Sequence, residues 1–283
     1  MDIIAALERI PIQDLHLHEA HEPGRLQKTC DSIRQEGMLR HPILATPMDG
    51  GYLVLDGAHR LASLRRLGCV YAPVQIIERE HLSLSAWDHV VPDGEWLDHW
   101  MKKAKVRCVP EAEAATEEVV VTLIRQRKPY ALLLPEGEDA AGKRLSLWRS
   151  LVENYSRRFK VIRLPYETGM HPDEKMVCIR HVVCDLEEVM KTVMHGEVYP
   201  AGVTRFLVEG RLLNLCIPLA LMADDPSAQR AWEQSLAHWR SHLRCYTEKV
   251  YLCEASSGTL LMGERAGRAP NVVSDAAPIL SAN

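Results

Sequence analysis

The sequence lacks any long uninterrupted hydrophobic segment. Although 47% of its 283 residues are hydrophobic, no run approaches the roughly 18 apolar residues that a membrane-spanning helix requires. Residues 1–9 carry acidic side chains within their apolar stretch and lack the small-residue cleavage site of a secretory signal. We therefore expect a soluble, cytoplasmic protein without a membrane partner.

The chain also lacks an excess of positive charge. Its 34 Lys and Arg residues are outnumbered by 38 Asp and Glu residues, which gives a formal net charge of −4. Proteins that bind nucleic acids commonly carry a basic excess that attracts the phosphate backbone. We therefore expect no nucleic-acid partner.

The eight cysteines lack the CxxC spacing that is typical of zinc and redox motifs. A chain of this length has no need of a disulfide framework, so we expect reduced and mostly buried thiols. The densest group of possible metal ligands combines His16, His18 and His21 with Glu19 and Glu22. A structural metal ion there is the less favoured interpretation.

The length exceeds that of one average domain, and predicted strands alternate with predicted helices, which favours a mixed α/β (α+β) fold. We divide the chain into an N-terminal domain at 1–80, a tryptophan-bearing helical bridge at 81–110, a second α/β domain at 111–268 that completes the substrate site, and a flexible tail at 269–283. The tail is predicted because its Ala, Pro and Ser residues show no periodicity.

The N-terminal domain has a clear order of predicted elements. Residues 11–18 alternate like a strand, and 25–36 form a helix whose apolar stripe ends at Gly37. Strands at 41–45 and 52–55 flank an Asp-Gly-Gly turn, which indicates a β-hairpin. In the second half, strands and helices are predicted at 119–124, 131–134, 140–159, 161–164, 186–193, 206–209, 212–217 and 229–243.

The second hairpin strand ends in Asp56-Gly57-Ala58-His59-Arg60 and turns directly into a helix. Backbone N–H groups at such a helix start favour an anion, and Gly57 lets the backbone approach it closely. His59 and Arg60 add donors to phosphate, whereas Asp56 beside an anion suggests a carboxylate that faces Mg²⁺ or positions an attacking group. The alternative interpretation is a helix-capping turn that binds nothing.

Residues 26–74, and 32–43 and 55–62 within them, resemble the ParB/sulfiredoxin superfamily. The resemblance implies a ParB/sulfiredoxin-like domain at 1–80 that binds the phosphates of a nucleotide. Sulfiredoxins carry a catalytic cysteine where Ala58 stands, which argues against sulfinic acid reduction. Chromosome-partitioning ParB proteins carry a Gly-Glu-Arg-Arg turn and then a helix-turn-helix, and neither is found in this sequence.

A third branch of this superfamily, the free L-serine kinases, is the most similar. His18 and Glu19 match the His-Glu pair after the first strand of these enzymes, and 56–60 is similar to their Asp-Gly-His-His-Arg turn. Residues 199–205 and 211–219 resemble the kinases' Pro-x-x-x-Thr-Arg and Arg-x-Leu-Asn-x-x-x-Pro-Leu stretches.

The sequence departs from these kinases at two positions. Ala58 replaces the first histidine of the turn, so one phosphate donor is missing or supplied elsewhere. Phe206 stands where the kinases often have histidine after the Thr-Arg pair. Any role for that position is therefore in doubt.

The resemblance implies transfer of a phosphoryl group from ATP or ADP to free L-serine, giving O-phospho-L-serine for a biosynthetic pathway such as siderophore synthesis. Such transfer needs positioning, charge neutralisation and a base for the hydroxyl proton. Glu19 is the candidate base, with Glu22 as the fallback. Asp56 would orient the terminal phosphate or Mg²⁺, and residues 57–60 would hold the phosphate oxygens.

Two further residues are candidates for binding serine. Arg205 suits a bidentate clamp on the carboxylate, and Trp87 could form a wall of the pocket. The alternative interpretations are a surface arginine and a core tryptophan. The Trp- and His-bearing helix at 229–243 could suggest haem, but side chains at helical spacing more often pack in a core.

A non-catalytic alternative stays open. The same fold could serve a nucleotide-responsive regulator that binds CTP or ATP, and serine-dependent nucleotide turnover would separate the two hypotheses. The sequence leaves open the choice between ATP and ADP, between serine and a close analogue, and the oligomeric state.

Overall fold

The computed structural model describes most of the chain. Residues 1–244 form one compact unit and 245–283 a second, and each is considered by itself. The described residues are 3–21, 23–115, 118–134, 140–166 and 173–246. The predicted tail at 269–283 lies outside them.

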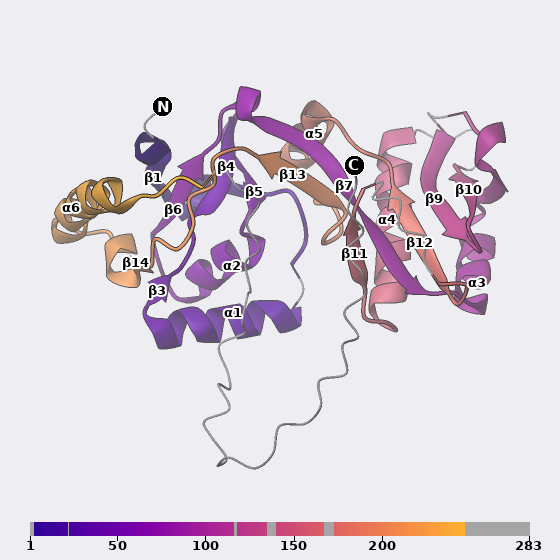
Figure 1. Ribbon diagram of the computed structural model, residues 1–283, viewed down its shortest axis with the longest axis horizontal. Coiled ribbons are helices and arrows are strands. Elements are labelled where there is room, and N and C mark those ends of the chain that lie inside the picture. The colour runs from indigo at the N-terminus through magenta and orange to yellow at the C-terminus, as the bar shows by residue number, and fades with distance from the viewer. Residues whose placement is uncertain (1–2, 22, 116–117, 135–139, 167–172, 247–283) are drawn as a thin grey trace, which may run out of the picture. The chain divides into compact units, whose positions relative to one another are not determined.

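The N-terminal part is built around a five-stranded mixed sheet with the order β1-β6-β4-β5-β2 (Figure 1). Its strands are β1 (Leu7–Pro11), β2 (Leu15–Leu17), β4 (Ile43–Met48), β5 (Gly51–Asp56) and β6 (Tyr71–Ile76). β2 pairs with β5, and β4 with β6, in parallel, whereas the other neighbours are antiparallel. The predicted hairpin is confirmed as β4 and β5, but the predicted strand at 11–18 is interrupted between β1 and β2.

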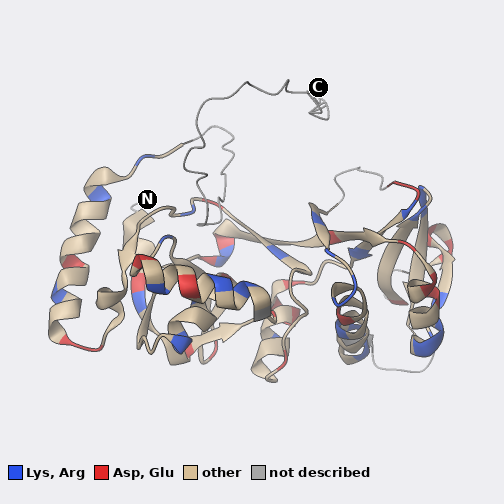
Figure 2. Cartoon of the chain, turned by 90° about the horizontal axis from the view of Figure 1, so that it is seen from below, with Lys and Arg blue, Asp and Glu red and all other residues tan. Residues whose placement is uncertain are grey.

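Helices α1 (Pro23–Glu36) and α2 (Ala58–Arg66) lie on one face of this sheet. Their apolar residues recur at helical spacing, so Ile33, Leu61 and Leu64 bury in one core with the sheet. Acidic and basic residues are interspersed along α1 (Figure 2), whereas α2 carries three arginines and no acidic residue.

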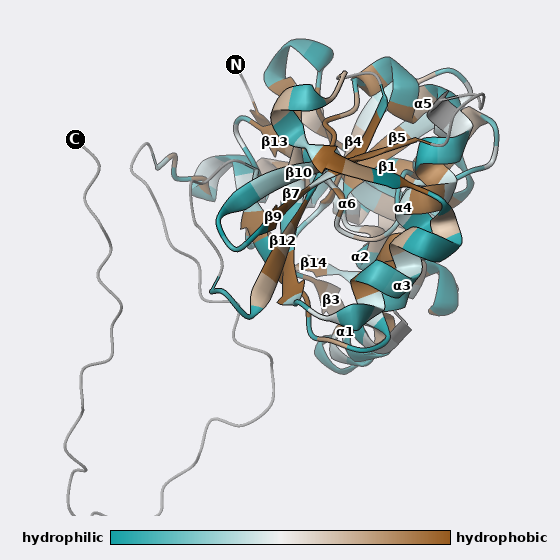
Figure 3. Ribbon diagram, turned by 90° about the vertical axis from the view of Figure 1, so that its right-hand side faces the viewer, coloured by the Kyte–Doolittle hydropathy of each residue, from teal (hydrophilic) through white to brown (hydrophobic). Residues whose placement is uncertain are grey.

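The second sheet is antiparallel and has seven strands in the order β11-β7-β12-β9-β10-β8, with β13 also paired to β7. These strands are β7 (Leu82–Pro92), β8 (Arg107–Pro110), β9 (Val119–Arg125), β10 (Lys128–Leu133), β11 (Ile162–Pro165), β12 (Met176–His181) and β13 (Thr204–Val208). β9 and β12 are largely hydrophobic, as Figure 3 shows, because they occupy the middle of the sheet. The mixed α/β fold class is thereby confirmed.

Three helices share a hydrophobic core with this sheet. They are α3 (Glu95–Ala104), α4 (Ala140–Ser156) and α5 (Leu186–Met194). From α4, Trp148 and Tyr155 are fully buried in a core that also includes strand residues such as Leu123. The indole of Trp148 donates to the carbonyl of Val120 at 2.7 Å, which satisfies its polar group in the core.

The predicted helical bridge at 81–110 is wrong for most of its length. Residues 82–92 form β7, the central partner of β13, β11 and β12, and only α3 in this segment is helical. The tryptophan spacing suggested a helix, whereas the sheet on both sides of β7 buries residues such as Asp88 and His89 on opposite faces.

After β13 the chain returns to the N-terminal sheet. β14 (Ile217–Pro218) pairs with β3 (Met38–Leu39), and α6 (Pro226–His242) follows. Trp232 and Trp239 of α6 bury in the N-terminal core, which confirms packing as the role of these tryptophans.

Candidate functional site

The parallel pairing of β2 with β5 brings two acidic residues to one edge of the N-terminal sheet. Leu17 lies opposite Val54, and both strands end within two residues of that pair. Glu19 and Asp56 therefore follow the carboxyl ends of adjacent parallel strands, where such sheets gather functional side chains.

The buried His18 ring connects two strands at this edge of the sheet. Its Nδ1 lies 2.5 Å from the Val54 carbonyl, which can only accept, so Nδ1 carries the proton and Nε2 accepts from the Thr204 hydroxyl at 2.8 Å. Burial lowers the pKa of His18 below its ordinary value, and the neighbouring carboxylate of Glu19 offsets only part of that effect. His18 is thus a neutral structural clamp between β5 and β13.

Glu19 is held by the segment that precedes β13. Its Oε2 accepts from the Gly202 backbone N–H at 2.8 Å, and its side chain is 22% exposed. The backbone on both sides is fixed to Tyr199, whose N–H donates to the His18 carbonyl at 2.7 Å and whose carbonyl accepts from Ala20 at 2.8 Å. A carboxylate so oriented and partly accessible can take a proton from a substrate.

Asp56 is an ionised carboxylate between two arginines. Its Oδ2 accepts from Arg60 at 3.0 Å and from Arg211. Burial alone would raise the pKa of Asp56, but the two guanidinium groups outweigh burial and lower it. The side chain is 46% exposed, so it remains available to a ligand.

The predicted phosphate turn is a strand end followed at once by α2. Gly57 has φ +112°, and a Cβ there would lie 3.2 Å from both the Arg60 guanidinium and Ile43, so glycine is required. Ala58 is buried as the first helical residue, and no side chain in the described region caps this helix start. The first N–H groups of α2 therefore point out of the helix without intrahelical partners, as anion binding requires.

Arg60, the predicted phosphate anchor, is held by backbone carbonyls. Its Nη1 donates to the carbonyls of His41 at 2.9 Å and Pro42 at 2.5 Å, and its side chain is only 18% exposed. It therefore pins the segment before β4 to the turn and orients Asp56. His59 lies near His21, with ring centroids 6.3 Å apart.

The two predicted serine-binding residues lie against each other. Arg205 of β13 stands over the ring of Trp87 of β7, with Cζ 4.5 Å from the ring centroid. Both are partly exposed. The tryptophan thus orients a guanidinium group that keeps some access to solvent.

Sequence reasoning missed the three residues that complete this edge, namely Gly202, Thr204 and Arg211. Each lies within a stretch that resembles the kinase motifs, which is the signal that could have found them. Their contacts with Glu19, His18 and Asp56 join residues more than 150 positions apart, so local pattern could not reveal them.

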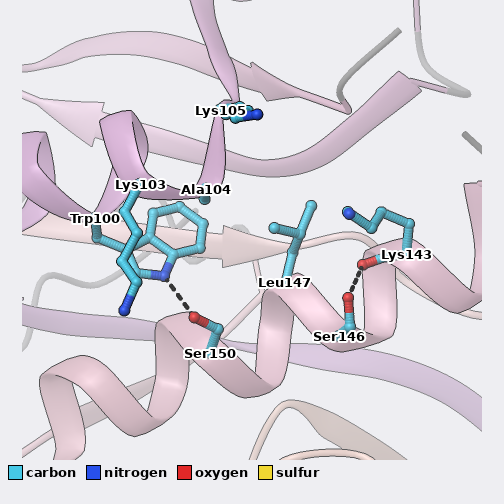
Figure 4. A pocket seen from close by; sticks show the side chains of 8 residues that line it. All are labelled: Trp100, Lys103, Ala104, Lys105, Lys143, Ser146, Leu147 and Ser150. Carbon is cyan, nitrogen blue, oxygen red and sulfur yellow. Dashed lines mark hydrogen bonds between the residues drawn. The ribbon is translucent and has the colours of Figure 1, made fainter. Parts of the chain in front are cut away.

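A groove of about 380 Å³ lies elsewhere, between α3 and α4. Figure 4 shows Trp100 donating to Ser150 across it, with Lys103, Lys105 and Lys143 around it. None of the predicted site residues lines this groove.

The less favoured metal site combined His16, His18 and His21 with Glu19 and Glu22, of which Glu22 lies outside the described residues. Both ring nitrogens of His18 are used by Val54 and Thr204, and within the described ranges no group of three potential ligands gathers. None of the helices in the described part of the chain has the length and hydropathy needed to cross a membrane.

Comparison with known proteins identifies closely similar chains, although no family model matches. The ATP-dependent L-serine kinase SbnI of Staphylococcus aureus is 37% identical over 251 residues, which cover 88% of this chain and 97% of that protein. The ADP-dependent L-serine kinase SerK of Thermococcus kodakarensis is 26% identical over 215 residues, 70% of this chain and 86% of that protein.

Comparison with solved structures finds proteins of the same kind as the sequence comparison. The C-terminally truncated SbnI superposes with a TM-score of 0.75 at 36% identity, covering 83% of this chain and 98% of that one. A free serine kinase in complex with AMP has a TM-score of 0.64 at 21% identity, covering 77% of this chain and 93% of that one, and shares the fold.

Proposed function

Since the chain belongs to the family of L-serine kinases, we propose that it transfers the terminal phosphoryl group of ATP to the hydroxyl of free L-serine. The observation that carries the proposal is the match to nearly the full length of SbnI, an ATP-dependent L-serine kinase. The juxtaposed Glu19 and phosphate turn support it.

The proposed reaction needs a base for the serine hydroxyl. Glu19 takes the hydroxyl proton as the serine oxygen attacks the terminal phosphorus, the bond from that phosphorus to the bridging oxygen breaks, and ADP leaves. The contact of Oε2 with Gly202 supports this role, because it fixes the carboxylate and leaves Oε1 to face the substrate.

The phosphates are proposed to bind at the start of α2. Gly57, Ala58 and His59 would supply backbone N–H groups, and the Arg211 guanidinium, 41% exposed beside Asp56, would add charge to the phosphoryl oxygens. Arg211 would thereby add to the anchoring role that the sequence suggested for Arg60.

The donor set at Asp56 fits Mg²⁺ that arrives with the nucleotide. It is a single ionised, half-exposed carboxylate, and both guanidinium contacts fall on Oδ2, which leaves Oδ1 for a cation. Mg²⁺ is commonly held by one or two carboxylates together with phosphate oxygens, whose charge it neutralises.

Serine is proposed to bind beside Trp87, with its carboxylate on Arg205. The contact between these side chains supports this, because a stacked guanidinium loses less freedom on binding a carboxylate. We further propose that the product, O-phospho-L-serine, enters a biosynthetic pathway such as siderophore synthesis in the cytoplasm.

Phosphorus NMR of the full chain with Mg²⁺, L-serine and either ATP or ADP tests the proposal. We expect a phosphoserine signal with ATP that Glu19→Ala abolishes and Glu22→Ala, the fallback base, retains. Absence of phosphoserine with both nucleotides, from folded protein that binds nucleotide, would refute the kinase proposal. Loss with Glu22→Ala instead would move the base to that residue.

A further inference from the structure

Gly202 connects the proposed base to a buried part of the second sheet. Its N–H donates to Oε2 of Glu19 at 2.8 Å, and its carbonyl accepts from Nε2 of His89 at 2.5 Å. The two peptide groups that flank one α-carbon are therefore fixed from opposite sides. A displacement of this α-carbon therefore changes both contacts at once.

The backbone at Gly202 is confined. Its φ is +73°, and a Cβ there would overlap the guanidinium group of Arg163. The neighbouring carbonyls are held independently, since Arg149 donates to Val198 at 2.8 Å and the Trp87 N–H donates to Val203 at 3.0 Å. Loss of the His89 contact would thus loosen Gly202 without releasing the whole segment.

The protonation of His89 follows from its partners. The Gly202 carbonyl can only accept, so Nε2 carries the ring proton and Nδ1 accepts from the Tyr155 hydroxyl at 2.5 Å. Burial raises the pKa of Tyr155 well above its ordinary value, so this hydroxyl keeps its proton. Tyr155 thereby holds the His89 ring at Nδ1 while Nε2 holds the Gly202 carbonyl.

Neither residue can touch a substrate. His89 is 1% exposed on β7, and Tyr155 is fully buried on α4. A role in the reaction must therefore pass through Gly202.

We propose that His89 and Tyr155 are positioning residues for phosphoryl transfer, acting on Glu19 through the Gly202 backbone. The inference rests on the proposed function, in which Glu19 is the base. It predicts that disturbing the pair lowers the rate of the chemical step without weakening the binding of serine or ATP.

Steady-state kinetics of full-length variants test the inference. His89→Ala is expected to lower kcat about tenfold or more while KM for serine and ATP stays within about twofold. His89→Gln keeps an Nε2–H donor for Gly202 and is expected to recover most of the lost kcat. Tyr155→Phe is expected to lower kcat about fivefold, since it removes one hydrogen bond.

Nitrogen NMR of the His89 ring adds a spectroscopic test. The wild-type ring should show a proton on Nε2, as the Gly202 carbonyl requires, and Tyr155→Phe should shift the Nδ1 signal because it removes the hydrogen bond at that nitrogen. His99→Ala, on the exposed side of α3, and Tyr130→Phe, on β10, are matched controls that should leave both kcat and the His89 signals unchanged.

The outcomes separate the two proposals. If wild type makes phosphoserine and Glu19→Ala does not, but His89→Gln and Tyr155→Phe fold and keep full kcat, the positioning inference is wrong while the kinase proposal stands. A raised KM for serine with unchanged kcat would also overturn it. If wild type makes no phosphoserine, the kinase proposal fails, whereas the tautomer measurement still tests the geometry of the pair.

Discussion

At the scale of single residues, the site depends on charges and backbone groups supplied from distant parts of the chain. Asp56 and Arg60 belong to the phosphate turn, but Arg211 reaches Asp56 from a segment 155 positions later. The Arg60 side chain is 18% exposed and that of Arg211 is 41% exposed, so Arg211 is the more accessible cation at this carboxylate. The charge around Asp56 therefore depends on the late segment.

Arg211→Met is expected to lower kcat/KM for ATP about a hundredfold, because removing one charged donor at a developing phosphoryl charge costs about 10²–10³ in rate. Steady-state kinetics at saturating serine measure it. Arg157→Met, at an exposed arginine paired with Glu153 on α4, is the control and should leave the rate unchanged. Equal rates for Arg211→Met and wild type would exclude Arg211 from the reaction.

Gly202→Ala is expected to lose both stability and activity. Gly196 has nearly the same backbone angle, φ +76°, but a Cβ there meets nothing within 4 Å. Both substitutions should cost about 1 kcal/mol for the left-handed conformation, while only Gly202→Ala should add the clash with Arg163 and lower kcat. Urea unfolding and kinetics of the two variants give the comparison, and similar kcat values would contradict it.

At the scale of elements, short strands and helix starts place the functional groups. β2 has only three residues, and its parallel pairing with β5 is what aligns Glu19 with Asp56. One residue separates α2 from the end of β5, so Gly57 alone connects the strand to the helix. α5 is fixed at its start by the Asp185 carboxylate, which accepts from the Glu188 N–H at 2.7 Å.

Asp185→Ala is expected to lower the free energy of unfolding by about 1 kcal/mol, the usual cost of losing an N-cap. Asp185→Asn keeps a capping oxygen and should cost little. Neither should change kcat, because α5 contributes no group to the site. Chemical denaturation of the three proteins measures the effect, and equal losses for Ala and Asn would show that the cap is not its cause.

At the scale of the molecule, the two sheets share a hydrophobic core within residues 1–244. Leu53 and Leu55 of β5 belong to the same buried cluster as Val91 of β7 and Leu123 of β9. α6 closes the other core from the far end of the chain. The site therefore lies where both sheets contribute residues.

This shared core predicts that residues 1–244 unfold in one cooperative transition, which nucleotide shifts to higher temperature as a whole. Differential scanning calorimetry of the full chain with and without ADP is the measurement. Two separate transitions, of which nucleotide shifts only the first, would show that the sheets unfold independently.

The molecule should also lose stability as the pH falls below about 6.5. Burial lowers the pKa of His18 and lowers that of His181 well below 6.5, so the unfolded chain binds protons that the folded chain rejects. Each such histidine contributes a slope of up to about 1.4 kcal/mol per pH unit in that range.

Urea unfolding between pH 7.5 and 5.5 tests this expectation. His181→Leu should flatten the slope, whereas His195→Gln should not, since the His195 side chain is exposed at the end of α5. An unchanged slope in His181→Leu would mean that other groups carry the acid sensitivity.

The sequence by itself determined the hairpin and the turn at 56–60, because strand alternation, glycine punctuation and helix starts are local properties. It also carried the family resemblance. The candidates Glu19, Trp87 and Arg205 came from that resemblance and stay predictions. The sequence-based prediction was wrong at β7, where tryptophans among charged residues were interpreted as a helix. The strands that pair with β7 lie far away in the chain, so no local pattern indicates them.

Only the tertiary structure decided how these residues work together. The pairing of Arg211 with Asp56, the capture of Glu19 by Gly202 and the support of Gly202 by His89 all join distant segments. Such contacts arise from the packing of both sheets around shared cores, and no periodicity along the chain encodes them.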